Sequence, residues 1–202
     1  GDIVQNHLST YGTLENLPDK VAIQLNDTHP TLAIPEMMRI LLDECGFGWD
    51  KSFDICQKVF SYTNHTVMAE ALEKWNVDIF KMTLPRIYQI VVEMDRRARE
   101  KLEAAFPGDQ GKINYMALIG DNQVRMANIC AYTANSINGV SKLHSEIIKE
   151  SVFHDYYLFK PQAFKNVTNG IAYRRWLLAS NPELCKLLDE TIGTGYKHDA
   201  AD

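Results

Sequence analysis

Three short runs of β-prone residues end at an asparagine, and each is followed by a segment with helical periodicity. The runs and their asparagines are 21–25 with Asn26, 60–63 with Asn64, and 164–168 with Asn169. Strands that alternate with helices predict an α/β sheet. In such sheets ligands bind at the carboxyl ends of the strands. The strand ends are therefore the first candidate functional site.

The spacing of apolar residues predicts the helices between these strands. One helix follows Pro30 and ends at the glycines of 46–48, and the next begins near Asp50. The longest helical region is predicted over 68–105, with a fresh start at Pro85. The later elements are predicted as a short strand at 116–119, a helix at 122–134, a turn at 137–140, and a helix at 141–150 capped by Ser141. Helices exceed strands, so we expect a helix-rich, doubly wound sheet.

The composition is that of an ordinary soluble globular protein. Of the 202 residues, 46% are hydrophobic and 23% are charged, which is enough apolar material for a sizeable core. The formal net charge of −5 gives no reason to expect a nucleic acid or an anionic membrane as partner. No apolar run approaches the roughly 20 residues of a membrane span. The chain starts at Gly1 without a secretory pattern, and both ends resemble interior sequence, so we expect an excised piece of a longer protein.

The four cysteines stand far apart and lack the paired spacing of a zinc site: they are Cys45, Cys56, Cys130 and Cys185. This pattern predicts reduced thiols of a cytosolic protein. Glycine-rich nucleotide loops and the G-x-S-x-G hydrolase elbow do not occur either. Neither nucleotide binding nor serine-hydrolase chemistry has a motif in this sequence.

The turn at 26–30 concentrates hydrogen-bonding side chains. In the simplest interpretation, Asp27 or Thr28 caps the helix that follows. Asp27 and His29 are also metal-ligand types, but one turn supplies at most two ligands, and the nearest others would be His65 and Glu70. A helix cap and a metal site both stay open here.

The other two strand ends present amides and a histidine. Residues 64–66 read Asn-His-Thr and precede Glu70 and Glu73, which the predicted helix places on one face of its first turn. Two carboxylates there could serve acid and base catalysis, or simply compensate the helix dipole. Asn169 precedes Gly170, where a free backbone conformation lets main chain and side chain both approach a ligand. Amides with one acid and two imidazoles suit a polyhydroxylated ligand better than a phosphate or a base.

Longer motifs around these residues resemble the α-glucan (glycogen, starch and maltodextrin) phosphorylases. The matching stretches are Ala22-Ile23-Gln24-Leu25-Asn26-Asp27-Thr28-His29-Pro30, Tyr62-Thr63-Asn64-His65-Thr66-Val67, Glu70-Ala71-Leu72-Glu73-Lys74-Trp75, Asn138-Gly139-Val140 with His144-Ser145-Glu146-Ile147, and Thr168-Asn169-Gly170-Ile171 with Arg174-Arg175-Trp176-Leu177. They follow the family's order and spacing over nearly the whole chain from Val21 onward.

The resemblance implies a fold and an activity. The fold would be of the two-domain GT-B type, with 1–168 as the C-terminal part of the N-terminal α/β domain and 169–202 as the first elements of the C-terminal domain. The activity would be that of a glycosyltransferase, the reversible phosphorolysis of α-1,4-glucan to glucose 1-phosphate, with pyridoxal phosphate as cofactor. The implied partners are the glucan and phosphate, in a cytoplasmic protein whose full-length form we expect to be a homodimer.

The resemblance also implies roles for individual residues. His65 is similar to the family's catalytic histidine, which binds the 6-hydroxyl of the glucosyl unit while its backbone carbonyl faces the anomeric carbon. Asn169 resembles the asparagine that shares this hydroxyl. The other substrate-binding residues implied are Asp27, His29, Glu70, Ala71 and Glu73 beside the β face of the anomeric carbon, and Val140 at a wall of the sugar pocket.

Several of the family's motifs are missing from this chain. The cofactor lysine, the phosphate-binding Lys/Arg pair and the acidic residue that holds the 2- and 3-hydroxyls lie later in the family's sequence, so we expect the isolated chain to be inactive. The aromatic of the animal glycogen-storage site is replaced by Val92. From the residues alone, two alternatives remain: a metal-assisted carbohydrate hydrolase that uses Asp27, His29 and His65, and a non-catalytic glucan-binding module.

Overall fold

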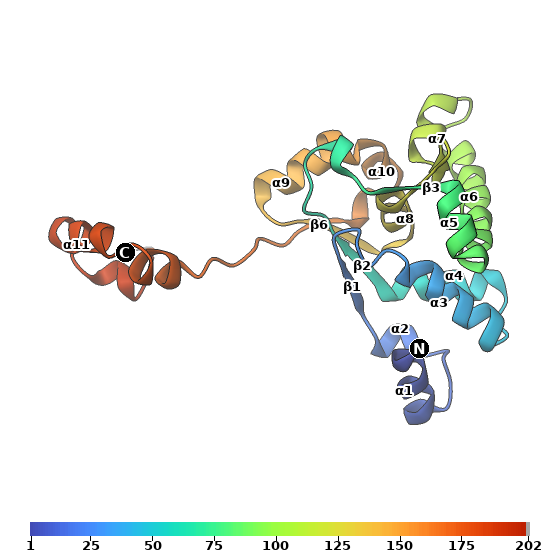
Figure 1. The fold of residues 1–202 in the computed structure, drawn as a ribbon, viewed down its shortest axis with the longest axis horizontal. Helices are drawn as coiled ribbons and strands as arrows, with labels where there is room; N and C mark the ends of the chain where they lie inside the picture. Colours follow the sequence, from blue (N-terminus) through green and yellow to red (C-terminus); the bar gives the residue numbers. More distant parts are fainter. Residues whose placement is uncertain (201–202) are drawn as a thin grey trace. The chain divides into compact units, whose positions relative to one another are not determined.

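The computed structural model describes residues 1–200, which divide into two compact units, 1–168 and the segment that begins at Asn169. The first unit is built on a four-stranded parallel sheet in the order β1-β2-β6-β7 (Figure 1). Its strands are β1 (Ile23–Asn26), β2 (Phe60–Thr63), β6 (Ser136–Gly139) and β7 (Phe164–Asn166). The α/β class with a parallel sheet and many helices is therefore confirmed.

A small antiparallel sheet lies beside the helices of the first unit. Its order is β3-β5-β4, with β3 (Lys74–Asn76), β4 (Ile119–Gly120) and β5 (Gln123–Arg125). The helices of this unit are α1 (Asp2–Tyr11), α2 (Leu17–Lys20), α3 (Ala33–Arg39), α4 (Trp49–Val59), α5 (Val77–Thr83), α6 (Pro85–Ala105), α7 (Gln110–Met116), α8 (Met126–Thr133), α9 (Lys142–Ile147) and α10 (His154–Phe159). Helices α3 and α9 each continue as a wider π-helical stretch, over Ile40–Glu44 and Ile148–Val152. Single 3-10 turns occupy Ala69–Ala71 and Pro161–Ala163.

The second unit is a short helical segment. It contains a π-helical stretch (Arg174–Ala179), α11 (Pro182–Thr191), whose N-cap Asn181 accepts a hydrogen bond from Leu184 N, and a 3-10 turn (Gly195–Lys197). None of the helices within residues 1–200 combines the length and the apolar composition that a membrane span requires.

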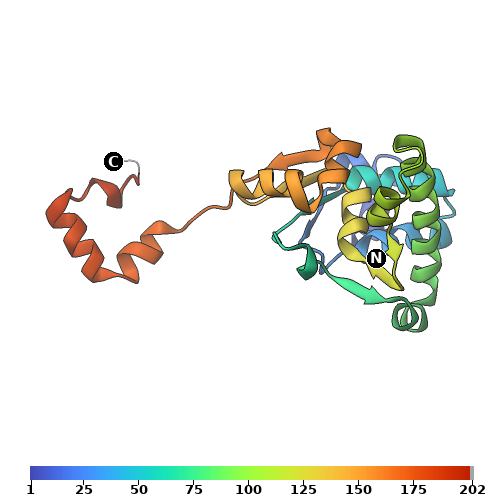
Figure 2. The ribbon, with the colours of Figure 1, turned by 90° about the horizontal axis from the view of Figure 1, so that it is seen from above.

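The core forms where the apolar faces of helices cover the sheet. Phe60 and Tyr62 alternate along β2 and are fully buried. Helix α6, drawn in green in Figure 2, is the longest of the helices in residues 1–200. It buries one stripe that includes Ile90, Met94 and Leu102. This spacing is that of an amphipathic helix packed on a core. The local apolar pattern therefore explains why these segments fold as they do.

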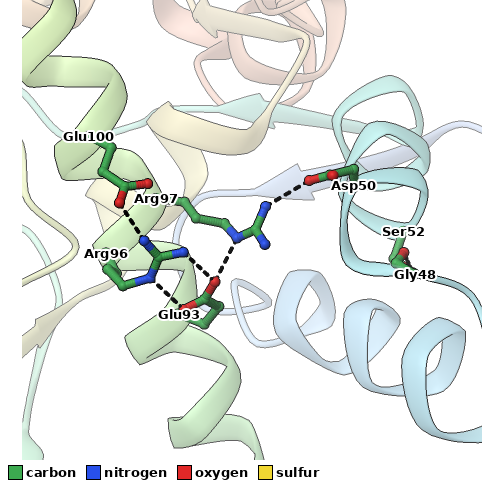
Figure 3. A network of polar contacts seen from close by, with 7 residues as sticks. All are labelled: Gly48, Asp50, Ser52, Glu93, Arg96, Arg97 and Glu100. Carbon is green, nitrogen blue, oxygen red and sulfur yellow. Dashed lines mark hydrogen bonds and ion pairs between the residues drawn. The ribbon is translucent and has the colours of Figure 1, made fainter.

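Ion pairs link the exposed side of α6 to α4. Glu93 accepts hydrogen bonds from the guanidinium groups of Arg96 and Arg97, and Arg97 also reaches Asp50 at 2.7 Å (Figure 3). Arg96 pairs in addition with Glu100. Because the arginines donate to its carboxylate, the pKa of Glu93 falls to about 2. The side chains are partly solvated, so these ion pairs contribute little to stability.

Several predicted elements are confirmed. Strands β1 and β2 and helices α3 and α4 lie where the apolar pattern predicts them. Ser141 caps α9 by accepting a hydrogen bond from His144 N at 3.1 Å. The third strand is shorter than predicted, because β7 ends at Asn166, three residues before Asn169.

The predicted helix at 68–76 is wrong. One 3-10 turn occupies Ala69–Ala71, and Lys74–Asn76 forms strand β3, which pairs with β5. Helix α5 starts only after Asn76, whose side chain accepts hydrogen bonds from Asp78 N and Ile79 N. Glu70 and Glu73 therefore do not share the first turn of a helix.

The predicted turn at 137–140 is also wrong, because 136–139 forms β6 between β2 and β7. Asn-Gly pairs are frequent in turns, but Asn138 is buried here and its side chain is satisfied. It accepts from Thr63 Oγ1 at 2.7 Å and donates to Gly139 O at 3.0 Å. Nearby, the predicted strand at 116–119 shifts to β4, and the helix predicted at 122–134 begins at Met126 after β5.

Candidate functional site

The carboxyl end of β1 turns sharply at Asp27. Asn26 pairs with Thr63 in the β1–β2 ladder, and Asp27 N then donates to Thr63 O at 2.8 Å. Asp27 has a φ of 65°, in the left-handed region that Asp and Asn tolerate better than most residues. Its Oδ1 accepts a hydrogen bond from Thr28 N at 2.7 Å. The Asp27 side chain therefore stabilises its own turn.

Glu73 holds this turn from the other side. Thr28 Oγ1 donates to Glu73 Oε2 at 2.8 Å, and Trp75 Nε1 donates to Glu73 Oε1 at 2.9 Å. His29 Nδ1 lies 3.7 Å from the same carboxylate. Thr28 is buried, whereas His29 is largely exposed. Neither Asp27 nor Thr28 caps α3, whose N-cap is Leu32 without a side-chain bond, so the capping interpretation is wrong.

The end of β2 presents His65 from a loop that Asn64 shapes. Asn64 is fully buried; it donates through Nδ2 to Tyr62 Oη at 2.9 Å and accepts from Thr66 N at 3.1 Å. His65, in contrast, is exposed, and its Nε2 lies 2.6 Å from Asn26 Oδ1. The histidine of the predicted site thus lies beside the end of β1, as the strand-end interpretation expects.

The end of β6 joins the same edge through His144. Val140 N donates to His144 Nδ1 at 3.1 Å, and His144 Nε2 lies 3.4 Å from Thr66 O. His144 is buried. Because Nδ1 accepts from a backbone amide, the neutral ring carries its proton on Nε2, which points toward the Thr66 carbonyl. His144 therefore ties the Val140 segment to the loop that carries His65.

Glu70 and Ala71 lie in the connection to β3. Both are exposed, and Ala71 N donates to Met68 O within the 3-10 turn. Glu70 and Glu73 line a cavity of about 310 Å³ together with Leu72, Lys74, Tyr115, Asp121, Arg125, Ala127 and Asn128. No hydrogen bond within the described part of the chain joins Glu70 or Ala71 to Asp27, His29 or His65.

Asn169 is the first residue of the second unit and is exposed. Its role at a 6-hydroxyl stays a prediction. Across residues 1–200, no group of three or more His, Cys, Asp and Glu side chains is arranged to hold a metal ion. The metal alternative therefore finds no set of ligands in this part of the chain.

The first unit also places at the site four residues that the predictions leave without an individual role. Asn26 contacts His65, Asn64 shapes its loop, Trp75 binds Glu73 and His144 links two strand ends. Asn26 and Asn64 each end one of the predicted strands, so their positions at the edge could be expected. Trp75 and His144 fall at spacings typical of the buried face of a helix, so the local pattern does not indicate their contacts with Glu73 and Val140.

The arrangement can bind hydroxyl groups, and the buried thiol and phenol beside it are not activated as nucleophiles. Burial raises the pKa of the Cys130 thiol to about 12. The hydrogen bond between Thr31 Oγ1 and Cys130 Sγ, at 3.1 Å, lowers this pKa but does not offset the burial. Burial also raises the pKa of the Tyr62 phenol. Both groups therefore stay protonated at neutral pH. Amides, imidazoles and carboxylates remain, and these donate to and accept from hydroxyls.

Sequence comparisons place this chain beside known proteins. The sequence model of a family described as carbohydrate phosphorylase matches residues 1–202. The chain is 48% identical over 188 residues to the brain form of glycogen phosphorylase from Rattus norvegicus, 47% over 194 residues to the liver form from Bos taurus, and 47% over 185 residues to the muscle form from Oryctolagus cuniculus. These matches cover 92%, 95% and 90% of the chain. The chain spans only 22% to 23% of the length of these relatives.

Proposed function

Because this chain belongs to the carbohydrate phosphorylase family, we propose that it is part of an α-1,4-glucan phosphorylase. The reaction is the reversible transfer of a terminal glucosyl unit from the 4-hydroxyl of an α-1,4-glucan to phosphate, which gives glucose 1-phosphate. Since the chain corresponds to about a fifth of its relatives, we also propose that it is inactive when isolated from the rest of the enzyme.

One observation carries this proposal beyond family membership. His65 meets Asn26 across the ends of β1 and β2, Thr28 donates to the carboxylate of Glu73, and His144 accepts from Val140 N after β6. Such a set suits the hydroxyls of a sugar. We assign His65 to the 6-hydroxyl of the glucosyl unit, with Asn169 as its second partner.

The remaining predicted substrate-binding residues are assigned to the same glucosyl group of the substrate. We assign Asp27, His29, Glu70, Ala71 and Glu73 to the side of the anomeric carbon, and Val140 to a wall of the pocket. The backbone carbonyl of His65 would face the anomeric carbon, where positive charge develops as the glycosidic bond breaks. Fixed dipoles directed at a developing charge lower the barrier without a protein nucleophile.

The family uses pyridoxal phosphate, and the predicted site residues of this chain offer no cationic side chain for its phosphate. None of the predicted site residues is a lysine or an arginine, and Asp27, Glu70 and Glu73 are acidic. A phosphate group needs cationic partners or backbone amides. We therefore assign the cofactor to a part of the enzyme outside this chain and derive no step through it.

The wider architecture follows the same proposal. We infer a doubly wound sheet within a GT-B type enzyme, with 1–168 in its N-terminal domain and 169–202 opening its C-terminal domain. We also infer a cytoplasmic homodimer for the full-length protein.

Two assays test the proposal. The full-length protein that carries this chain, loaded with pyridoxal phosphate, should release glucose 1-phosphate from maltodextrin and phosphate. The isolated chain should release none under the same conditions. Absence of product from the full-length protein would overturn the phosphorylase assignment, and clear product from the isolated chain would overturn the fragment assignment.

A further inference from the structure

Asn26 and His65 meet across the ends of two neighbouring strands. His65 Nε2 lies 2.6 Å from Asn26 Oδ1, a short hydrogen bond between side chains 39 positions apart in the sequence. The backbone fixes both partners: Asn26 is the last residue of β1 and pairs with Thr63, and His65 follows Thr63 by two residues. The ladder therefore sets the distance at which the amide and the imidazole face each other.

This contact determines which ring nitrogen carries the proton. An amide oxygen has no proton to give, so the bond requires His65 to donate through Nε2. In the neutral ring, Nδ1 then carries only a lone pair and acts as an acceptor. None of the hydrogen bonds among residues 1–200 involves His65 Nδ1, and the residue is exposed. An acceptor is thus presented at the strand ends, where a ligand with a hydroxyl proton can bind it.

We propose that Asn26 is a positioning residue, which holds His65 with its proton on Nε2 so that Nδ1 accepts a hydrogen bond from a ligand hydroxyl. The inference rests on the proposed function in one respect: it takes that hydroxyl to be the 6-hydroxyl of the glucosyl unit. Asn26 acts through His65 and does not touch the reacting atoms. Its effect should therefore fall on the discrimination between sugars that have or lack this hydroxyl.

The chain offers a matched control for this contact. His7 Nε2 lies 2.8 Å from Asn16 Oδ1, the same pair of side chains joined through the same atoms. His7 is in α1 and Asn16 precedes α2, away from the strand ends. Asn16→Leu removes this amide oxygen just as Asn26→Leu removes the other. A general effect of breaking a His–Asn pair should appear in both variants.

The experiment compares two glucosyl donors in the direction of chain synthesis. The full-length enzyme, loaded with pyridoxal phosphate, receives maltodextrin and either glucose 1-phosphate or 6-deoxyglucose 1-phosphate, and the ratio of the two kcat/KM values is measured. The wild-type enzyme should favour glucose 1-phosphate at least tenfold, the value of one well-made hydrogen bond. Asn26→Leu should lower this ratio about tenfold. Asn26→Asp, which keeps an oxygen acceptor, should retain most of it, and Asn16→Leu should leave it unchanged.

Each other result overturns the inference. The inference fails if Asn26→Leu keeps the wild-type ratio, if Asn16→Leu lowers the ratio as much, or if Asn26→Asp loses it as fully as Asn26→Leu. A purely structural role for Asn26 would lower kcat/KM for both donors equally and leave the ratio unchanged. A wild-type enzyme that transfers neither donor would instead overturn the proposed function, which separates the two failures.

Discussion

Gly139 ends β6 at a place where α9 leaves no room for a side chain. A Cβ atom on Gly139 would lie 2.7 Å from Ser145 Oγ, 2.8 Å from Ser145 N and 2.9 Å from Ser145 Cα. Two of these atoms belong to the backbone, so rotation of the Ser145 side chain cannot relieve the overlap. Ordinary contact begins at 3.4 Å, so Gly139→Ala should force strand and helix about 0.6 Å further apart at Ser145 N. Overpacking of this kind costs about 1–3 kcal/mol.

The same substitution at Gly111 is the matched control. Gly111 lies within α7, where a Cβ atom would meet only Asp109 Oδ1 at 3.6 Å. Because alanine forms helices better than glycine, Gly111→Ala should stabilise the protein by about 0.5–1 kcal/mol. The two variants carry one chemical change, and we expect opposite signs.

Urea unfolding followed by circular dichroism measures both effects. With a slope of about 2 kcal/mol per M, the midpoint should fall by about 0.5–1.5 M for Gly139→Ala and rise by about 0.3–0.5 M for Gly111→Ala. Adding Ser145→Ala to Gly139→Ala should recover little, because the backbone overlap persists. A Gly139→Ala midpoint at or above that of the wild type, or full recovery by Ser145→Ala, would refute the reasoning.

The contact between Thr28 and Glu73 should appear as an interaction energy in a double-mutant cycle. Thr28→Val with Glu73→Ala should destabilise by about 1–2 kcal/mol less than the two single effects added together, and strictly additive urea midpoints would contradict the contact. Burial lowers the pKa of Lys160 from 10.5 to about 7, so between these pH values the unfolded state binds a proton that the folded state has released. This group should make stability rise with pH from about 7 to about 10.5, and Lys160→Met should flatten that rise; an unchanged slope of urea midpoint against pH would contradict the burial effect.

Local patterns predict the elements whose signals are local. Phe60 and Tyr62 alternate as a half-buried strand requires, and α3 has its apolar stripe and a glycine after its end. The candidate edge could also be predicted, because parallel strands bring their carboxyl ends together. Asp27 directly follows β1, His65 lies two residues after the end of β2, and these strands pair side by side.

The misses arise where long-range partners override local signals. Asn138 and Gly139 indicate a turn until Thr63 is known to satisfy the amide inside the sheet. Trp75 falls at a helical spacing, but pairing with Val124 draws its segment into a strand. The contact of Thr28 with Glu73 joins residues 45 positions apart, and no pattern within a short window indicates which residues meet over such a separation.

The order of the strands also bears on how the chain is made. The large sheet runs β1-β2-β6-β7, the same order as the sequence, so each new strand adds beside the previous one. Parallel neighbours need a crossover, so no hairpin can nucleate this sheet. During synthesis, the apolar residues of β2 lack their second neighbour until 136–139 has left the ribosome. We expect chaperone protection to matter most in that interval, when an unpaired strand edge and uncovered apolar side chains favour aggregation.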